Sequence, residues 1–133
     1  MTGKSRGALQ YDDLAAWLIE EIPELEDAYK REMEWWGQEK PGPHIIYGDV
    51  LTPYIIQLLE SGEQTQATKR VFCVLETMLA DQDIEVQAVA VVTVFERLVG
   101  NRDWLRSMKP FAGPLAREAV RDLIEGSESE REW

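Results

Sequence analysis

The chain has 133 residues, of which 44% are hydrophobic, and this length and composition predict one domain with its own apolar core. They exclude a wholly disordered chain, and because no apolar run approaches the ~20 residues of a transmembrane helix, they also exclude a membrane-spanning segment. A formal net charge of -11 at pH 7 argues against nucleic acid and anionic membranes as partners, since an acidic surface repels phosphate groups.

Helical spacing of apolar residues begins in "YDDLAAWLIEEIPELEDAYKREMEWWG". Here we expect one helix capped by Asp12 or Asp13, and then a second helix with Pro23 in its first turn. Gly37 is placed to end the second helix. The stretch "GQEKPGPH" that follows is rich in glycine and proline and therefore predicts a loop.

Two further helices are predicted after this loop. In "IIYGDVLTPYIIQLLESG" apolar residues share one face, and with Asp49 as the cap, Pro53 falls in the first turn, where a missing N–H costs little. Gly62 is suited to end this helix in a left-handed conformation. The segment "EQTQATKRVFCVLETMLADQD" predicts a helix that stops around Asp81.

The stretch "DQDIEVQAVAVVTVFERLVGN" is the most apolar part of the chain. Residues Gln87 to Phe95 have the β-branched content of a strand, but no convincing second strand exists to pair with it. A helix capped by Asp81 or Asp83 and ending at Gly100 would be apolar on most sides, which is typical of a surrounded helix. We therefore expect a central helix with Val91 in its buried part.

The remaining segments predict a short helix at "RDWLRSM" and a last one at "LAREAVRDLIEG", ended by Gly126. The fold class is thus all-α, as a compact bundle or a short HEAT-like helical solenoid of about six to seven helices. Residues 1–9 are expected to be a flexible N-terminus, residues 10–126 a single helical domain, and residues 127–133 a flexible C-terminal tail.

Few residues are suited to catalysis. His44 is the only histidine and is predicted to lie in the loop, while the only cysteine, Cys73, is predicted to fill a small space in the core. Neither a Cys–His pair nor a two-histidine metal site can be assembled from them, and no glycine-rich phosphate loop is present. We therefore expect no enzyme activity, no cofactor and no metal site. A single cysteine and the lack of an apolar leader favour a reducing, cytoplasmic setting.

Charge and aromatic residues point to protein binding instead. Residues 12–39 contain ten acidic and two basic residues, a net charge of -8, whereas residues 97–121 contain six basic and two acidic residues, a net of +4. Trp35 and Trp36 lie about 100° apart on a helix, so one indole is expected near the surface, unless both pack under the loop. Exposed tryptophan among acids suits a basic partner protein. The predicted partner-binding residues are Glu24, Asp27, Glu32, Glu34, Trp35, Trp36 and Glu39.

Two other interpretations of the surface remain open. In the first, the acidic residues only keep the protein soluble. In the second, the protein is a structural adaptor or oligomerisation module that binds through an apolar helical groove. Salt separates steering by charge from groove binding, because only the former weakens as ionic strength rises.

The stretch "DQDIEVQAVAVVTVFERLVGN" also resembles the second helix of a HEAT-type repeat, with Gln87 where such repeats commonly carry arginine. More broadly, "HIIYGDVLTPYIIQLLESG", "FERLVGN" and "MKPFAGPLAREAV" resemble small, acidic, all-helical bacterial proteins, some of which are immunity proteins of polymorphic toxin systems. The resemblance implies a cytoplasmic bacterial inhibitor that neutralises a toxin by occluding it, without chemistry of its own.

Overall fold

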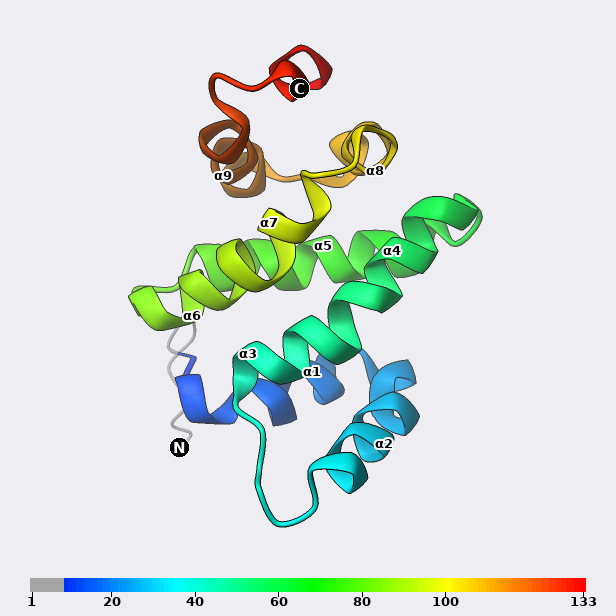
Figure 1. Cartoon of the computed structure of the whole chain (residues 1–133), viewed down its shortest axis with the longest axis vertical. Helices are drawn as coiled ribbons and strands as arrows, with labels where there is room; N and C mark the ends of the chain where they lie inside the picture. Colours follow the sequence, from blue (N-terminus) through cyan, green and yellow to red (C-terminus); the bar gives the residue numbers. More distant parts are fainter. Residues whose placement is uncertain (1–8) are drawn as a thin grey trace.

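The computed structural model describes residues 9–133, and within this range the chain is helical with no β-strand. Seven continuous helical runs lie between Tyr11 and Ile124 in the described part of the chain, followed by a short 3-10 helix. The prediction of an all-α bundle of six to seven helices is therefore confirmed (Figure 1). The predicted flexibility of residues 1–8 concerns a segment outside the described residues.

The first two runs form one end of the molecule. A 3-10 turn, η1 (Tyr11–Asp13), leads into α1 (Leu14–Glu21), and a second one, η2 (Pro23–Leu25), leads into α2 (Glu26–Trp36). Pro23 lies in the first turn as predicted. The predicted cap is different: Asp13 occupies the N-cap position of α1 but its side chain makes no capping hydrogen bond, since the run already begins at Tyr11.

The third run is longer than the sequence suggested. It comprises α3 (Pro43–Ile46), the π-helical segment η3 (Tyr47–Leu51) and α4 (Thr52–Ser61). The predicted start at Asp49 is therefore wrong, and so is the placement of His44 in a loop, because the run begins with Pro43 in its first turn. Gly62 ends the run at φ 68°, in the left-handed conformation that was predicted.

This extension places Pro53 well inside the run, where a proline lacks the N–H for the helical ladder. The backbone widens to a π-helix just before it, and the Thr52 N–H bonds to the Tyr47 carbonyl five residues earlier. With the same five-residue spacing, a backbone N–H at position 53 would have donated to the Gly48 carbonyl, but proline has none. The Arg97 Nη1 donates to that oxygen instead, at 3.0 Å.

The fourth run, α5 (Thr65–Leu79), ends close to the predicted position. The fifth comprises α6 (Ile84–Ala88), the π-helical segment η4 (Val89–Phe95) and α7 (Glu96–Leu98), so the stretch from Gln87 to Phe95 is helical. Asp83 caps it by accepting a hydrogen bond from the Glu85 backbone N–H at 2.9 Å. The helical interpretation of this apolar stretch is thus confirmed.

One side of the fifth run nevertheless reaches solvent. Val94 and Phe95 are fully buried, but Val91 is only half-buried and Val92 is 48% exposed. The expectation that Val91 is surrounded is therefore wrong. The reason is that α5, η3 and α9 contact η4 from the buried side and leave the opposite side uncovered.

The C-terminal part contains α8 (Arg102–Met108), the 3-10 turn η5 (Lys109–Phe111) and α9 (Pro114–Ile124). A distant carboxylate caps α9: Glu76 of α5 accepts hydrogen bonds from the backbone N–H groups of Leu115 at 2.6 Å and Ala116 at 3.1 Å. Gly113 makes this possible, because a Cβ there would lie 2.6 Å from the Glu76 carboxyl carbon. The cap joins the C-terminal helix to the middle of the bundle.

The last residues do not extend away from the domain as a free tail. They form the 3-10 helix η6 (Glu128–Glu132), capped by Ser127, and the Trp133 Nε1 donates to the Arg117 carbonyl of α9 at 3.0 Å. Ion pairs to α8 and a half-buried indole thus place the segment against the domain, and the flexibility expected for residues 127–133 stays a prediction.

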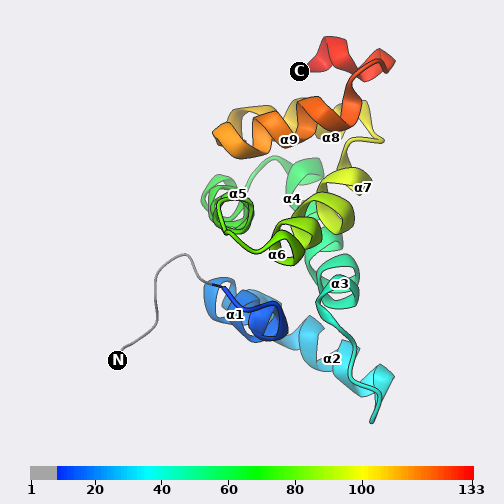
Figure 2. The same cartoon turned by 90° about the vertical axis from the view of Figure 1, so that its left-hand side faces the viewer.

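The helices are arranged along one axis. In Figures 1 and 2, α1 and α2 lie at one end, α8, α9 and the C-terminus lie at the other, and the two long runs meet α5 in the middle. The two π-helical segments, η3 and η4, contact each other there. Among the helices of residues 9–133, none has the length and apolar character required to cross a bilayer.

Candidate functional site

The helix α2 is the least buried long helix of the molecule. None of its residues is fully buried, although Ala28, Tyr29 and Met33 pack against the core from its inner side. On its outer side Trp35 is 82% exposed, the highest value among the large hydrophobic side chains. The prediction that one of the two tandem indoles lies at the surface is confirmed, and that indole is Trp35.

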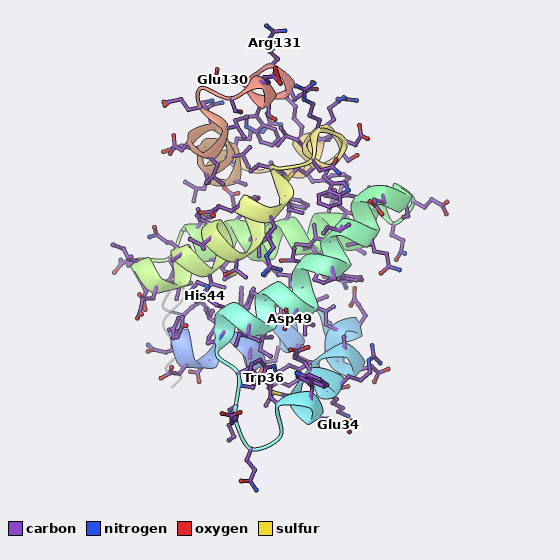
Figure 3. All side chains as sticks on the ribbon, in the orientation of Figure 1. Glu34, Trp36, His44, Asp49, Glu130 and Arg131 are labelled. Carbon is purple, nitrogen blue, oxygen red and sulfur yellow. The ribbon has the colours of Figure 1, made fainter. Side chains whose placement is uncertain are left out.

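Trp36 has a different environment. It is half-buried, and its Nε1 donates to the Glu32 Oε2 at 2.9 Å. Glu32 in turn lies beside Asp49 of η3, and Figure 3 shows Trp36 and Asp49 in this region between α2 and the third run. Burial, followed by the hydrogen bond with the Asp49 carboxyl group, raises the pKa of Glu32 above its ordinary value of 4.5. Glu32 and Trp36 therefore serve the internal packing of α2.

Glu24 is also engaged within the molecule. Its carboxylate accepts a hydrogen bond from the Tyr54 hydroxyl at 2.7 Å and forms an ion pair with Arg70. Burial, followed by the bond to Glu24, raises the pKa of Tyr54 to about 12. Glu24 thus attaches η2 to α4 and α5, and we do not count it among the acids that are free to meet a partner.

The other predicted binding residues form one exposed group, which we call the α2 face: Asp27, Glu34, Trp35 and Glu39. Glu34 and Trp35 are consecutive in the last turn of α2, and Glu39 follows in the turn after Gly37, where its N–H bonds to the Trp36 carbonyl at 3.1 Å. Figure 3 shows Glu34 at the outer end of the molecule. The α2 face therefore combines one large apolar side chain with three carboxylates in water.

Residues that often carry chemistry are not grouped. Cys73 is exposed on α5, so its prediction as a core residue is wrong, because the buried face of α5 is formed by its neighbours Val71, Phe72, Val74, Leu75 and Met78. His44 is paired through its Nδ1 with the Thr93 hydroxyl at 2.5 Å. Within residues 9–133, no three His, Cys, Asp or Glu side chains lie close enough to hold a metal ion.

Sequence reasoning missed the polar contact between the two long runs, which we call the helix crossing: His44, Gly48, Thr52, Thr93 and Arg97. Thr52 donates to the Tyr47 carbonyl at 3.0 Å, and its hydroxyl also lies 3.3 Å from the Thr93 carbonyl. Gly48 gives these side chains room, because a Cβ there would lie 3.1 Å from the Arg97 Nη2 and 3.2 Å from the Thr93 Cγ2, which is tighter than ordinary contact. A glycine five residues before a proline inside one apolar stripe is the signal that would have pointed to it.

An apolar strip was also missed. Ile84 is 75% exposed and Val92 is 48% exposed, and their spacing of eight residues places them on the same side of the fifth run. The half-buried Ala88 and Val91 lie on this side too. This strip is the feature that corresponds to the predicted apolar binding groove.

Comparison with known proteins gives one finding. A model of the family DUF7674, described as a domain of unknown function, matches residues 15–126. No curated protein and no solved structure shows significant similarity to the chain. The matched range contains α2, the helix crossing and α9, and it ends before η6.

Proposed function

The chain belongs to the DUF7674 family, a domain of unknown function, and from its surface we propose a non-catalytic module that binds a basic protein partner on the α2 face. The observation that carries this proposal is the exposure of Trp35, 82% of which is open to solvent. An exposed indole offers a partner a large, rigid apolar side chain to bury, and tryptophan is among the residues that most often dominate binding energy.

The charges around Trp35 favour a basic partner. Asp27, Glu34 and Glu39 are exposed, and residues 12–39 as a whole carry a net charge of -8, from ten acidic and two basic residues. Such a field speeds the approach of a positively charged protein before any contact is made. Trp35 would then anchor the complex once it has formed.

An inhibitor that acts by covering its target needs only a binding surface such as the α2 face, and no catalytic residues. The proposed class is a cytoplasmic inhibitor or immunity-type protein of bacteria, whose target is a basic protein such as a toxin enzyme. The resemblance of the helical segments to small acidic immunity proteins supports this class.

The experiment has two parts. A pull-down from the source cell with the full chain as bait identifies the partner, and the kinetics of binding are then measured with variants. Trp35→Ala is expected to speed dissociation by roughly 30-fold, which corresponds to about 2 kcal/mol for a hot-spot tryptophan. The double change Glu34→Lys and Glu39→Lys is expected to slow association and to weaken its dependence on salt, because these charges act before contact.

The matched control is Glu63→Lys, which makes the same kind of charge change in the exposed segment between α4 and α5. It should leave dissociation unchanged and affect association less than the double change does. A partner that is captured but is indifferent to both the tryptophan and the lysine changes would show that the α2 face is only a solvated surface.

A second candidate function is an adaptor that binds through the apolar strip of Ile84 and Val92. It is favoured by the exposure of these two side chains, 75% and 48%. Ile84→Ser with Val92→Ser would then abolish capture of the partner, whereas Trp35→Ala would not, and binding would be almost independent of salt.

A further inference from the structure

The C-terminal segment of residues 127–133 shows what kind of ligand the surface of α8 and α9 accepts. The Glu132 Oε1 lies 2.8 Å from the Arg106 Nε, and the next residue, Trp133, donates its indole N–H to the Arg117 carbonyl at 3.0 Å. A glutamate followed by a tryptophan is therefore bound by an arginine of α8 and a carbonyl of α9. We call this the Glu–Trp site.

The contacts that hold the segment differ in exposure. Its other ion pair, between Glu128 and Arg102 at 3.2 Å, has side chains that are 89% and 51% exposed, and pairs of this kind add roughly 0–1 kcal/mol. Gly126, at φ 82°, turns the chain in a left-handed conformation just before the segment. A hollow of about 450 Å³ remains between the segment and Arg102. Residues 127–133 thus occupy the Glu–Trp site in the way that a separate peptide ligand would.

Departure of the segment would take the carboxylates of Glu128 and Glu132 away from Arg102 and Arg106 of α8. Residues 97–126 contain six basic and four acidic residues, a net of +2, while residues 127–133 contain three acidic and one basic residue, a net of -2. The two nets cancel in the folded chain. Without residues 127–133, the Glu–Trp site would attract an acidic segment.

The chain contains a second copy of the bound sequence. The C-terminal residues 130–133 read "EREW", and residues 32–35 read "EMEW", so both follow the pattern Glu-x-Glu-Trp. In the second copy, Glu34 and Trp35 are the exposed residues of the α2 face, with Trp35 82% open to solvent. The two copies of the pattern therefore end in the same Glu–Trp pair, one bound and one free.

We propose that Glu34 and Trp35 of one copy of the protein bind the Glu–Trp site of a second copy, by replacing residues 127–133. Figure 3 shows Glu34 and Glu130 at opposite ends of the molecule, so the contact forms between two molecules and not within one. The contact is head-to-tail, and repeated use of it gives a chain or a ring. This inference rests on the same α2 face as the proposed function, and the surface that it assigns to that face is the arginine-bearing side of α8 in a second copy.

Self-association of the unmodified protein is weak for two reasons. The attached C-terminal segment competes at an effective concentration in the millimolar range. In addition, Glu128, which pairs with Arg102, lies four residues before Glu132. The residue four before Glu34 is Lys30, so the α2 face offers no carboxylate for Arg102 at that position. We expect association to be measurable by sedimentation velocity only at roughly 0.1–1 mM, because the site is free in a small fraction of molecules.

The first test releases the competitor in the full-length chain. Glu132→Gln with Trp133→Ala removes both contacts of the segment with the Glu–Trp site and leaves the α2 face intact. The released variant is expected to associate at least tenfold more tightly than the unmodified chain at the same salt concentration. Circular dichroism is the check that this variant is folded. A released variant that stays monomeric at 1 mM would overturn the proposal.

The second test uses complementation in the released variant. Adding Trp35→Ala destroys the donor face, and adding Arg106→Glu destroys the acceptor site, so each protein alone is expected to be monomeric. Their mixture retains one donor and one acceptor and is expected to give a dimer that does not grow further. Association that persists in either protein alone, or a mixture that stays monomeric, contradicts a head-to-tail contact.

The outcome is distinguishable from that of the proposed function. Loss of a pulled-down basic partner with Trp35→Ala, together with no self-association of the released variant, leaves the proposed function in place and removes this inference. Self-association that depends on Trp35 and Arg106 supports the inference even where no other basic protein is captured.

Discussion

The helix crossing and the α2 face differ in how their side chains are satisfied: buried polar groups are paired at the crossing, whereas an apolar side chain is exposed at the α2 face. At the crossing, a proline removes one backbone donor, and Arg97 replaces it on the Gly48 carbonyl. Among the described residues, no buried side-chain nitrogen or oxygen lacks a hydrogen-bond partner. At the α2 face, by contrast, a whole indole is left in water beside three carboxylates.

This difference teaches where stability and binding are located. Buried polar groups are costly when they lose their partners, so removing a hydrogen bond at the crossing should lower the free energy of unfolding. An exposed tryptophan adds little to folding, so α2 is free to carry a side chain that serves another molecule. Changes in the two regions should therefore separate cleanly into effects on unfolding and effects on binding.

The largest effect is expected at the buried side of the fifth run. Val94 is fully buried, so Val94→Asp places an unpaired charge in the core and should lower the free energy of unfolding by about 3 kcal/mol or more. Val92, two residues away and 48% exposed, is the control: Val92→Asp should cost less than about 1 kcal/mol. Urea unfolding measures both, and equal losses would show that the two sides of this run are not different.

A smaller loss is expected when the crossing loses its substitute donor. Arg97→Met keeps much of the apolar stem but leaves the Gly48 carbonyl without the bond at 3.0 Å, which should cost about 1–2 kcal/mol. Arg121→Met on the exposed side of α9 removes the same charge and serves as the control. If the two variants unfold at the same urea concentration, the bond from Arg97 does not compensate for Pro53.

A pH-dependent effect is expected at the inner side of α2. The pKa of Glu32 is raised in the folded protein, so the folded state binds this proton more tightly and loses stability as the pH rises from 4.5 through the folded pKa. Glu32→Gln retains an oxygen for the Trp36 indole and removes this loss. Its thermal midpoint relative to the unmodified chain should therefore rise between about pH 4 and pH 7, and a constant difference between the two midpoints would contradict this prediction.

The smallest effect on stability is expected for the residue most important to the proposed function. Trp35 is 82% exposed, so Trp35→Ala should change the free energy of unfolding by less than about 0.5 kcal/mol. A loss as large as that of a core residue would mean that the indole supports the fold, and the binding experiments with this variant would then need a different interpretation.

The sequence predicted the helices better than their joints. Apolar spacing identified the helical runs, and Gly62 and Asp83 were correctly expected at their ends, because these signals are local. Pro53 was misleading, since a proline near an acidic residue is normally the beginning of a helix. Only the distant Arg97, 44 residues away along the chain, makes its interior position acceptable, and no local pattern contains that information.

The candidate site was predicted in part for a similar reason. Adjacent tryptophans must diverge on a helix, so one exposed indole could be expected from spacing alone. Which acids are free could not, because Glu24 is bound by Tyr54 and Arg70 from two other helices. The C-terminal segment was expected to be free because it is polar, whereas α8 provides the arginines that bind it.

The exposure of Cys73 has a practical consequence for all of these measurements. It is the only thiol in the sequence, and it is exposed on α5, a helix that carries no residue of the α2 face and none of the Glu–Trp site. In air, two copies can be joined covalently through it, and such a disulfide-linked dimer would imitate self-association. The same thiol accepts one maleimide dye per molecule, which provides a single fluorescent label that leaves both binding surfaces unmodified.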